Sequence, residues 1–325
     1  MKEFFSDSFS KKIKLETRKI LIEHILDTEK NVREALETVS ESILEELYRL
    51  EREGKWWQVR ELIDAVIQQV TDETESIFEL LLEQTIEVAV EAGTKLSKDI
   101  TFDLLRRGGM DSEPIKKTYY RIHREAVDHM QKRTIKGLNL SDRIWSNSKR
   151  VNQTLGMIVK DGIFQGEHPV EIAKKLETYV QNGARTLVTQ YPNMMDRIGD
   201  MLPNDLSYEA LRLARTEMMA AYGEATKQSL DVIPSMSAVK WSLSNAGVAC
   251  HVCVENSKKD VGHGPGVYEK HQLPEYPAHP NCMCQLTPYM EDRDDFVDRL
   301  IEWKNNPSAH PDIEEWYKRN YMTEF

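Results

Sequence analysis

The amino-acid sequence predicts a mainly α fold, with long N-terminal helices, a helical middle region and a small α+β module that contains cysteines and histidines. Three observations lead to this prediction. Apolar residues recur at three- and four-residue steps through roughly the first 230 of the 325 residues, which is the spacing of a helix face. Beyond them the composition shifts to short alternating stretches with many glycines and prolines. All four cysteines of the chain lie in this second part.

The overall composition is typical of a helix-rich protein made in a reducing compartment. Hydrophobic residues make up 40% and charged residues 30%, no apolar run approaches the roughly 20 residues that span a bilayer, and the N-terminus lacks the apolar core of a signal peptide. In such a compartment paired cysteines more often hold metal than form disulfides. The net charge of −11 argues against general coating of nucleic acid, although residues 101–230, with 20 basic and 16 acidic side chains, leave room for a local contact.

The first expected helix covers residues 11–53. Its apolar positions form one stripe that requires a partner helix: Ile25, Val32, Leu36, Val39, Ile43 and Leu50. The partner is either a later helix of the same chain, in an intramolecular hairpin, or a second chain, in an intermolecular coiled coil.

Glycines mark the expected ends of the next helices. Gly54 ends the first helix, and a second one is expected from Trp57. A third is expected to start with a cap at Thr71 or Asp72 and to stop at Gly93. The pair Gly108–Gly109 then marks a boundary before the next helix.

The middle region is expected to contain helices over residues 114–137 and 207–230, and a helix, loop and helix over 159–180. In the helix expected over residues 207–230, Arg215–Thr216–Glu217 forms either an exposed charged pair or a buried polar link. Four domains follow from these boundaries. They are an N-terminal helical arm (residues 1–110), a helical middle region (111–235), a Cys/His module with short strands (236–290) and an acidic helical tail (291–325).

A basic stretch runs from Lys116 to Arg150, with ten Lys or Arg, three acidic residues, and Tyr119, Tyr120 and Trp145 interleaved. Such a stretch is either a solvated helix face or a contact for DNA phosphates, where Lys and Arg release counterions.

The module from residue 236 is expected to contain two short strands, "SAVKWSLSN" with Trp241 and "CQLTPY" before residue 290. Between them lies a loop rich in Gly and Lys that could not pack a core alone. The tail that follows is expected to be helical, with Trp303 and Trp316.

Two cysteine clusters face each other across this loop. Cys250 and Cys253 form a Cys-x-x-Cys knuckle, whose tight turn brings two thiolates to the separation that a tetrahedral zinc ion requires. The second cluster, "HPNCMC", offers His279, Cys282 and Cys284, so that the site is either Cys₃His or Cys₄. Two disulfides or four free thiols are the alternatives to metal.

We expect such a metal site to be structural, with no open position for a catalytic water, and its binding to contribute to folding. The remaining histidines of the module, His251, His263 and His271, are expected to be solvated rather than ligating.

The ordered set "DGIFQGEHPVEIAKKL", "LARTEMMAAYGEA", a strand with Trp241, "CHVC" and "YPAHPNCMC" resembles the minor head protein family of tailed bacteriophages, the Mu F-like head morphogenesis family. The resemblance covers roughly residues 140–288 and is sharpest over 209–288. The chain departs from the family pattern at Asn245–Ala246–Gly247, where an Asp is usual, and at Met283, where Arg is common. Neither departure removes a metal ligand.

The resemblance implies a non-enzymatic virion component, present in few copies at the portal vertex, that acts in capsid assembly and in genome packaging or ejection. Its implied partners are the portal protein and, through residues 1–110, portal, scaffold or capsid protein. The alternatives are an HNH-like metal-dependent nuclease using Asp260 and His263, a delivered toxin, for which too few residues follow the Cys/His window, and a general DNA-binding protein that uses the Lys116–Arg150 stretch.

Overall fold

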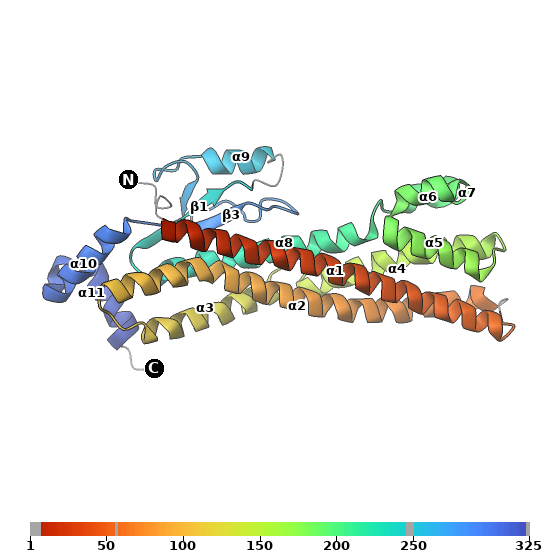
Figure 1. The fold of residues 1–325 in the computed structure, drawn as a ribbon, viewed down its shortest axis with the longest axis horizontal. Helices are drawn as coiled ribbons and strands as arrows, with labels where there is room; N and C mark the ends of the chain where they lie inside the picture. Colours follow the sequence, from red (N-terminus) through yellow and green to blue (C-terminus); the bar gives the residue numbers. More distant parts are fainter. Residues whose placement is uncertain (1–7, 56–57, 245–249, 323–325) are drawn as a thin grey trace. The chain divides into compact units, whose positions relative to one another are not determined.

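The computed structural model describes residues 8–55, 58–244 and 250–322, and these form eleven α-helices and one small antiparallel sheet (Figure 1). A mainly helical chain with a small sheet and a Cys/His cluster in its C-terminal part confirms the predicted fold class. Trp57 and Asn245–Ala246–Gly247 lie outside the described residues, as does the side chain of Trp145. None of the helices in the described ranges combines the length and apolar character needed to cross a bilayer.

The chain divides into two compact units, each assembled from separate sequence segments. Unit one comprises Met1–His24, Thr85–Lys132 and Arg215–Phe325, and unit two comprises Ile25–Gln84 and Arg133–Ala214. The helices α1 (Ser8–Arg52), α2 (Val59–Arg107) and α8 (Leu206–Gln228) contribute residues to both units. The four domains predicted from the sequence are continuous ranges instead, and stay a prediction.

Helix α1 is one long helix, as its apolar stripe predicted, and it ends just before Gly54, whose φ of +68° is left-handed. All six residues of the stripe are buried within the chain: Ile25, Val32, Leu36, Val39, Ile43 and Leu50. In unit one, α1 and α2 lie antiparallel, with the His24 ring hydrogen-bonded to the Thr85 hydroxyl at 3.1 Å and Lys95 3.9 Å from Glu16. The stripe itself lies in unit two and is buried there by the same chain, as expected of the intramolecular alternative.

The expected helix ends at Thr71 and Gly93 are wrong, because α2 continues through both positions to Arg107. Gly93 has a packing role instead. A Cβ atom there would lie 2.5 Å from the carbonyl oxygen of Tyr222 on α8, and the Thr226 hydroxyl donates to the Gly93 carbonyl at 3.2 Å. Glycine thus allows α2 and α8 to approach backbone to backbone, which its sequence position alone does not reveal.

Unit two contains four further helices: α4 (Leu140–Phe164), α5 (Pro169–Asn182), α6 (Ala184–Gln190) and α7 (Pro192–Ile198). The first two confirm the predicted helix, loop and helix. The loop turns at Gly166, whose φ is +70°, and the buried carboxylate of Asp161 accepts two hydrogen bonds from Arg197, at 2.7 and 2.6 Å. This paired charge links α4 to α7.

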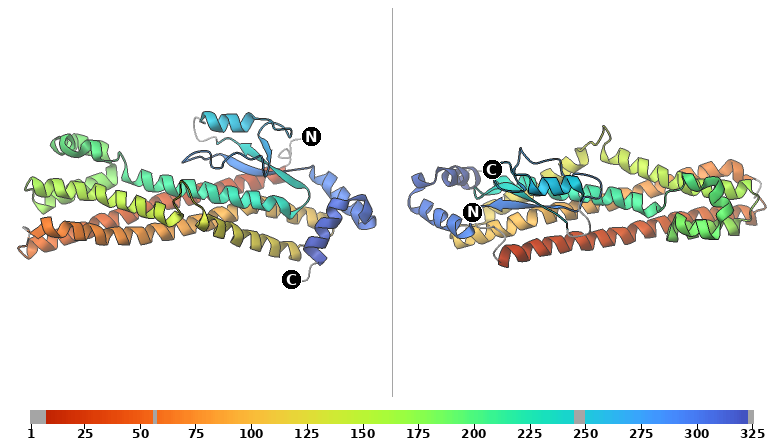
Figure 2. Two further views of the ribbon diagram at one scale, coloured as in Figure 1. Left: turned by 180° about the vertical axis from the view of Figure 1, so that it is seen from behind. Right: turned by 90° about the horizontal axis from the view of Figure 1, so that it is seen from above.

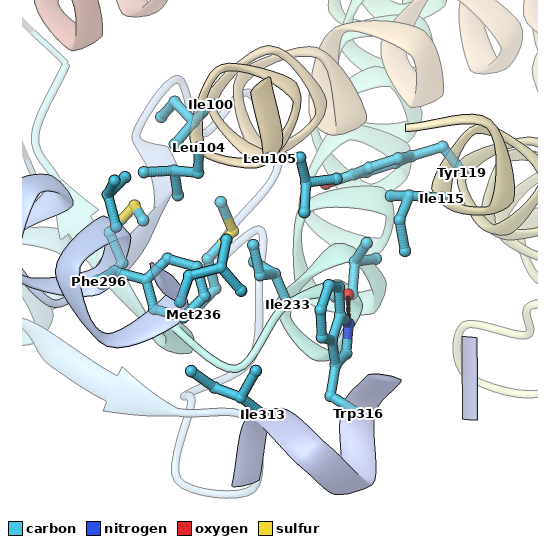
Figure 3. Close-up of a cluster of buried hydrophobic side chains, with 14 of the residues drawn as sticks. Ile100, Leu104, Leu105, Ile115, Tyr119, Ile233, Met236, Phe296, Ile313 and Trp316 are labelled. Atoms are coloured by element: carbon cyan, nitrogen blue, oxygen red, sulfur yellow. Dashed lines mark hydrogen bonds between the residues drawn. The ribbon is translucent and has the colours of Figure 1, made fainter. Parts of the chain in front are cut away.

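The core of unit one gathers apolar side chains from α2, α3 (Glu113–Lys132), α10 (Arg293–Asn305) and α11 (Pro311–Tyr317) (Figure 3). The tail is helical, as predicted, and both of its tryptophans are buried. The indole of Trp316 donates to the carbonyl of Val232 at 2.7 Å, which ties the last helix to the segment before the sheet.

The sheet has the order β2–β1–β3, with all pairs antiparallel: β1 (Met236–Ser242), β2 (Val267–Glu269) and β3 (Gln285–Met290). Strands β1 and β3 were predicted, whereas β2 and the helix α9 (His251–Lys258) occupy the segment that was expected to be a loop. The sheet lies between α9 and the unit-one part of α8 (Figure 2). The candidate metal ligands lie at the start of α9 and in the segment directly before β3.

Candidate metal centre

The first pair of cysteines lies at the start of α9. Cys250 is the residue that caps this helix, and its sulfur accepts a hydrogen bond from the backbone N–H of Cys253 at 3.3 Å. Cys253 lies in the first helical turn and is 1% exposed. The knuckle therefore directs both sulfurs to one point, because the capping hydrogen bond fixes their relative position.

The second cluster is built on a tight turn, as its spacing predicted. The N–H of Cys282 donates to the carbonyl of His279 at 3.1 Å, which closes a four-residue turn with Pro280 and Asn281 at its centre. Asn281 has a φ of +61°, and proline followed by a left-handed residue is the pattern of a type II turn. The sequence "HPNC" thus has a conformational reason, since proline presets the first central position and asparagine tolerates the second.

The two clusters meet at Cys253. Its sulfur lies 3.3 Å from Nε2 of His279 and 3.6 Å from the sulfur of Cys282. Two groups of ligand atoms share this residue, one with Cys250 and His279 and one with Cys282 and Cys284, and within each group all atoms lie within 4.8 Å of one another. A tetrahedral zinc ion with bonds of about 2.3 Å to sulfur and about 2.0 Å to nitrogen separates its ligands by about 3.8 Å for S···S and about 3.5 Å for S···N. The cluster could therefore bind a metal ion.

His279 is held in the orientation that a ligand needs. Its Nδ1 lies 2.8 Å from the carbonyl oxygen of Pro280. A carbonyl can only accept, so Nδ1 carries the proton and Nε2, which faces Cys253, keeps its lone pair. A backbone carbonyl that fixes the tautomer in this way is the usual support of a metal-bound histidine.

The sulfurs of the second cluster share a hydrogen bond that affects their pKa values in opposite directions. A hydrogen bond from the Cys282 thiol lowers the pKa of Cys284 to about 5, while the same hydrogen bond, together with burial, raises the pKa of Cys282 well above its usual range. Burial also raises the pKa of Cys253 to about 12.

All four cysteines are free thiols. The 3.6 Å between the sulfurs of Cys253 and Cys282 far exceeds a disulfide bond of about 2.05 Å, so the disulfide alternative is not the state seen here.

Helix α8 anchors the second cluster through three contacts. The Thr216 hydroxyl accepts from the backbone N–H of Asn281 at 3.2 Å, and the Tyr222 hydroxyl donates to the Leu286 carbonyl at 2.6 Å. A Cβ atom on Gly223 would lie 2.2 Å from the Tyr276 ring, so this glycine admits the ring against the helix. These contacts explain why the helix motif and the cysteine motif occur together.

The aromatic support of the site was not foreseen from the sequence. The Tyr276 ring packs edge-on against Trp241 of β1, with centroids 5.2 Å apart, and its hydroxyl donates to the Cys284 carbonyl. On α8, Glu217 is fully buried, whereas Arg215 and Thr216 are half-buried, so the exposed alternative does not hold for Glu217. The only sequence signals of this support were a glycine inside a strong helix and a tryptophan at alternating spacing.

The other histidines of the module lie outside both ligand groups. His251 is exposed, and both His263 and His271 face Glu269, at 3.0 and 3.5 Å. The carboxylate of Asp260 accepts from the backbone N–H groups of Gly262 and Gly264, at 2.8 and 3.0 Å, which lowers its pKa.

The segment between the clusters is ordered rather than a plain loop, in contrast to the sequence prediction. Tyr268 of β2 is fully buried, and its hydroxyl donates to the Asn256 carbonyl at 2.6 Å. Gly266, with a φ of +70°, lets the end of α9 approach the strand, because a Cβ atom there would lie 2.6 Å from the Ser257 carbonyl. The module therefore has packing of its own beside any metal.

Comparisons with protein-family models, with curated proteins and with solved structures found no match. The site thus defines a class of protein only through its geometry, which is a small helix-and-sheet module with five potential metal ligands, namely Cys253 and four residues around it. The resemblance to phage minor head proteins stays a prediction.

Proposed function

We propose that this protein is a structural minor head protein of a tailed bacteriophage, located at the portal vertex of the virion and acting in capsid assembly and in genome packaging or ejection. The observation that carries the proposal is that three of the separate sequence motifs of the resemblance pack together in unit one. The Arg215–Thr216–Glu217 helix touches the "HPNC" turn through Thr216, and the Trp241 strand touches the same cluster through Tyr276. Motifs from three segments thus form one module.

The role of this module is proposed to be structural, with one zinc ion as a crosslink. Cys250, Cys253 and Cys282 supply thiolates, and His279 supplies the fourth ligand because its ring is already oriented by Pro280. Four protein ligands leave no position for a catalytic water, in keeping with a protein that is not an enzyme. Cys284 is proposed to support the cluster next to the ion.

Attachment to a partner is proposed to use α1. The stripe first considered for that purpose is buried within the chain, but a second apolar row is exposed on the same helix: Leu15, Ile22 and Leu26, at 67, 43 and 59%. Their spacing of seven and four residues places them on one face. A partner helix of the portal, scaffold or capsid protein would bury this face.

Co-expression with the portal protein of the same phage tests the proposal. We expect the portal to be retained on the tagged protein and to be lost with the double substitution Leu15→Lys and Ile22→Lys. Leu80→Lys on α2 is the control, because Leu80 is 57% exposed and apolar but lies on another helix. Infectious particles of normal composition from a phage that lacks the gene would contradict the proposal.

A nuclease of the HNH type remains the competing hypothesis, and the geometry around Asp260 and His263 gives it little support. Asp260 binds the backbone of its own loop, and His263 faces Glu269. Divalent-metal-dependent nicking of DNA by the purified protein, abolished by His263→Ala, would favour the nuclease instead.

A further inference from the structure

Helix α3 presents one outward surface of unusual charge. Its buried side consists of Ile115, Thr118, Tyr119, Ile122, Ala126 and Met130. Of these, Ile115, Tyr119 and Ile122 belong to the core of unit one. Five exposed residues between positions 116 and 124 fall at steps of one, three and four and make up what is called here the basic face of α3: Lys116, Lys117, Tyr120, Arg121 and Arg124.

The charges of this face are only partly compensated. Lys116 pairs with Glu113, and Arg121 lies 3.8 Å from Glu125. For Lys117 and Arg124, no ion pair with another residue is found among the described parts of the chain. Four cations against two acids on one short face contrast with the chain's net charge of −11.

An ordinary solvated helix face has a different pattern, and α1 supplies an example. There each of three exposed lysines lies 3.5 to 3.9 Å from a glutamate four residues later: Lys12 and Glu16, Lys19 and Glu23, Lys30 and Glu34. Such alternation neutralises the face and supports the helix. On the basic face of α3, Lys116 and Arg121 have such acidic neighbours, but Lys117 and Arg124 have none among the described residues, so the charges of these two side chains are available to an external anion.

Tyr120 adds a second feature of a binding surface. Its side chain is 68% exposed, and the guanidinium of Arg124 lies over its ring, 5.8 Å from the centroid. An exposed aromatic ring beside a guanidinium group can stack on a base or donate its hydroxyl to a phosphate.

We propose that the basic face of α3 binds the phosphodiester backbone of DNA. From Lys117 to Arg124 the helix rises about 10 Å, which matches about three steps of one DNA strand at about 3.4 Å per step. Of the basic stretch Lys116–Arg150, only the part on α3 belongs to this proposed binding surface, because Arg143, Lys149 and Arg150 lie on α4 in unit two. The choice of DNA rests on the proposed function, whereas the recognition of phosphate rests on the basic face alone.

Fluorescence anisotropy with purified full-length protein tests the proposal, using a labelled 30-base-pair duplex and the corresponding single strand at low salt. The variant Lys117→Gln, Arg121→Gln, Arg124→Gln removes three charges from the face. The variant Lys12→Gln, Lys19→Gln, Lys30→Gln removes three exposed charges from α1 and is the matched control. Circular dichroism establishes that both variants are folded.

We expect the α3 variant to lose at least about tenfold in affinity and its salt slope to fall by about 2 to 3, since each phosphate contact contributes about 0.9 to the slope on duplex DNA. The α1 variant should change affinity less than about threefold by the same reasoning. The variant Tyr120→Ala tests whether the ring stacks on bases. A loss of affinity confined to single-stranded DNA would indicate stacking of Tyr120 on a base, whereas an unchanged affinity for both forms would indicate contact with the phosphate backbone only.

Three results would overturn the proposal: no binding by the wild-type protein, an equal loss in the α3 and α1 variants, or equal binding of polyglutamate, which would show a surface for any polyanion. The assay contains no portal protein. Its failure therefore leaves the portal test standing, and the reverse is also true.

Discussion

The hydroxyl of Thr216 on α8 accepts a hydrogen bond from the backbone N–H of Asn281, at 3.2 Å and across 65 residues of sequence. Asn281 is the left-handed residue of the turn that carries His279 and Cys282. A helix residue far away in sequence thus holds the ligand turn in place. The contact gives a physical reason for a threonine between Arg215 and Glu217.

Substitution of Thr216 tests this relationship. Thr216→Val keeps the shape of the side chain but leaves the Asn281 N–H without this acceptor, so we expect a loss of about 1 to 3 kcal/mol in the free energy of unfolding of the module. Chemical denaturation followed by tryptophan fluorescence measures it. Thr216→Ser retains the hydroxyl and should lose less than half as much; equal losses for the two variants would show that the hydrogen bond is not the cause.

The metal site makes a prediction about stoichiometry and ligand identity. Elemental analysis of purified protein should find one zinc ion per chain, retained in Cys284→Ser and lost in Cys253→Ser and Cys282→Ser, because Cys253 and Cys282 are proposed ligands. His279→Ala should also lose the ion. Retention in His279→Ala together with loss in Cys284→Ser would assign Cys₄ ligation and contradict the Cys₃His proposal.

Removal of the ion should loosen the module and spare the helices. Structural zinc ions contribute about 10 to 16 kcal/mol of binding free energy in small zinc-dependent folds, whereas the helices here pack on apolar cores of their own. A strong chelator should therefore expose the 250–290 segment to protease while far-UV circular dichroism changes little. Protection that is unaffected by the chelator would show that the packing of Tyr268 and Tyr276 is sufficient.

Periodicity in the sequence predicted the parts of the fold that obey local rules. The stripe on α1, the glycine at residue 54, the turn near Gly166 and the strand with Trp241 each follow from spacing or from backbone preference. The five ligand candidates could also be predicted from the sequence, because the Cys-x-x-Cys knuckle and the turn are local motifs.

Features that depend on distant contacts could not be predicted in this way. In the sequence, a glycine at position 93 suggests the end of a helix. Only the close approach of the Tyr222 backbone on α8 shows why glycine is required there within a continuous helix. Strand β2 has only three residues and is specified by its pairing with β1 rather than by an alternating pattern. The same holds for Tyr276, whose place against Trp241 depends on the tertiary fold.

The intramolecular hairpin can be tested at Leu36, which is fully buried in unit two. Leu36→Ala should lower the free energy of unfolding by about 2 to 5 kcal/mol, because it leaves a cavity in the bundle. Leu15→Ala, at a position 67% exposed, is the control and should change little. The melting temperature should not depend on protein concentration; an increase with concentration would indicate an intermolecular coiled coil.

Glu224 on α8 predicts a dependence of stability on acid pH. Burial would raise its pKa, but hydrogen bonds from Lys227 and Gln228 outweigh burial and lower it. Because the folded pKa lies below the unfolded value of about 4.3, the carboxylate stabilises the fold above that pH, and the effect is lost as pH falls through the folded pKa. The stability advantage of wild type over Glu224→Gln should therefore shrink below about pH 4. Glu125→Gln, at an exposed position, should show no such trend.

The last prediction concerns the close approach of α2 and α8 at Gly93. In an open helix, replacing glycine by alanine stabilises by about 1 kcal/mol, whereas overpacking a closed contact costs about 1 to 3 kcal/mol. At Gly93 the added carbon would lie 2.5 Å from a backbone oxygen and 2.9 Å from Ala225, and neither atom can rotate away, so Gly93→Ala should destabilise the protein. Gly199→Ala is the control, because its added carbon meets only the flexible Met195 side chain, at 3.1 Å, and should be neutral or stabilising. Thermal unfolding of both variants decides the sign, and a stabilised Gly93→Ala would show that the two helices can separate without cost.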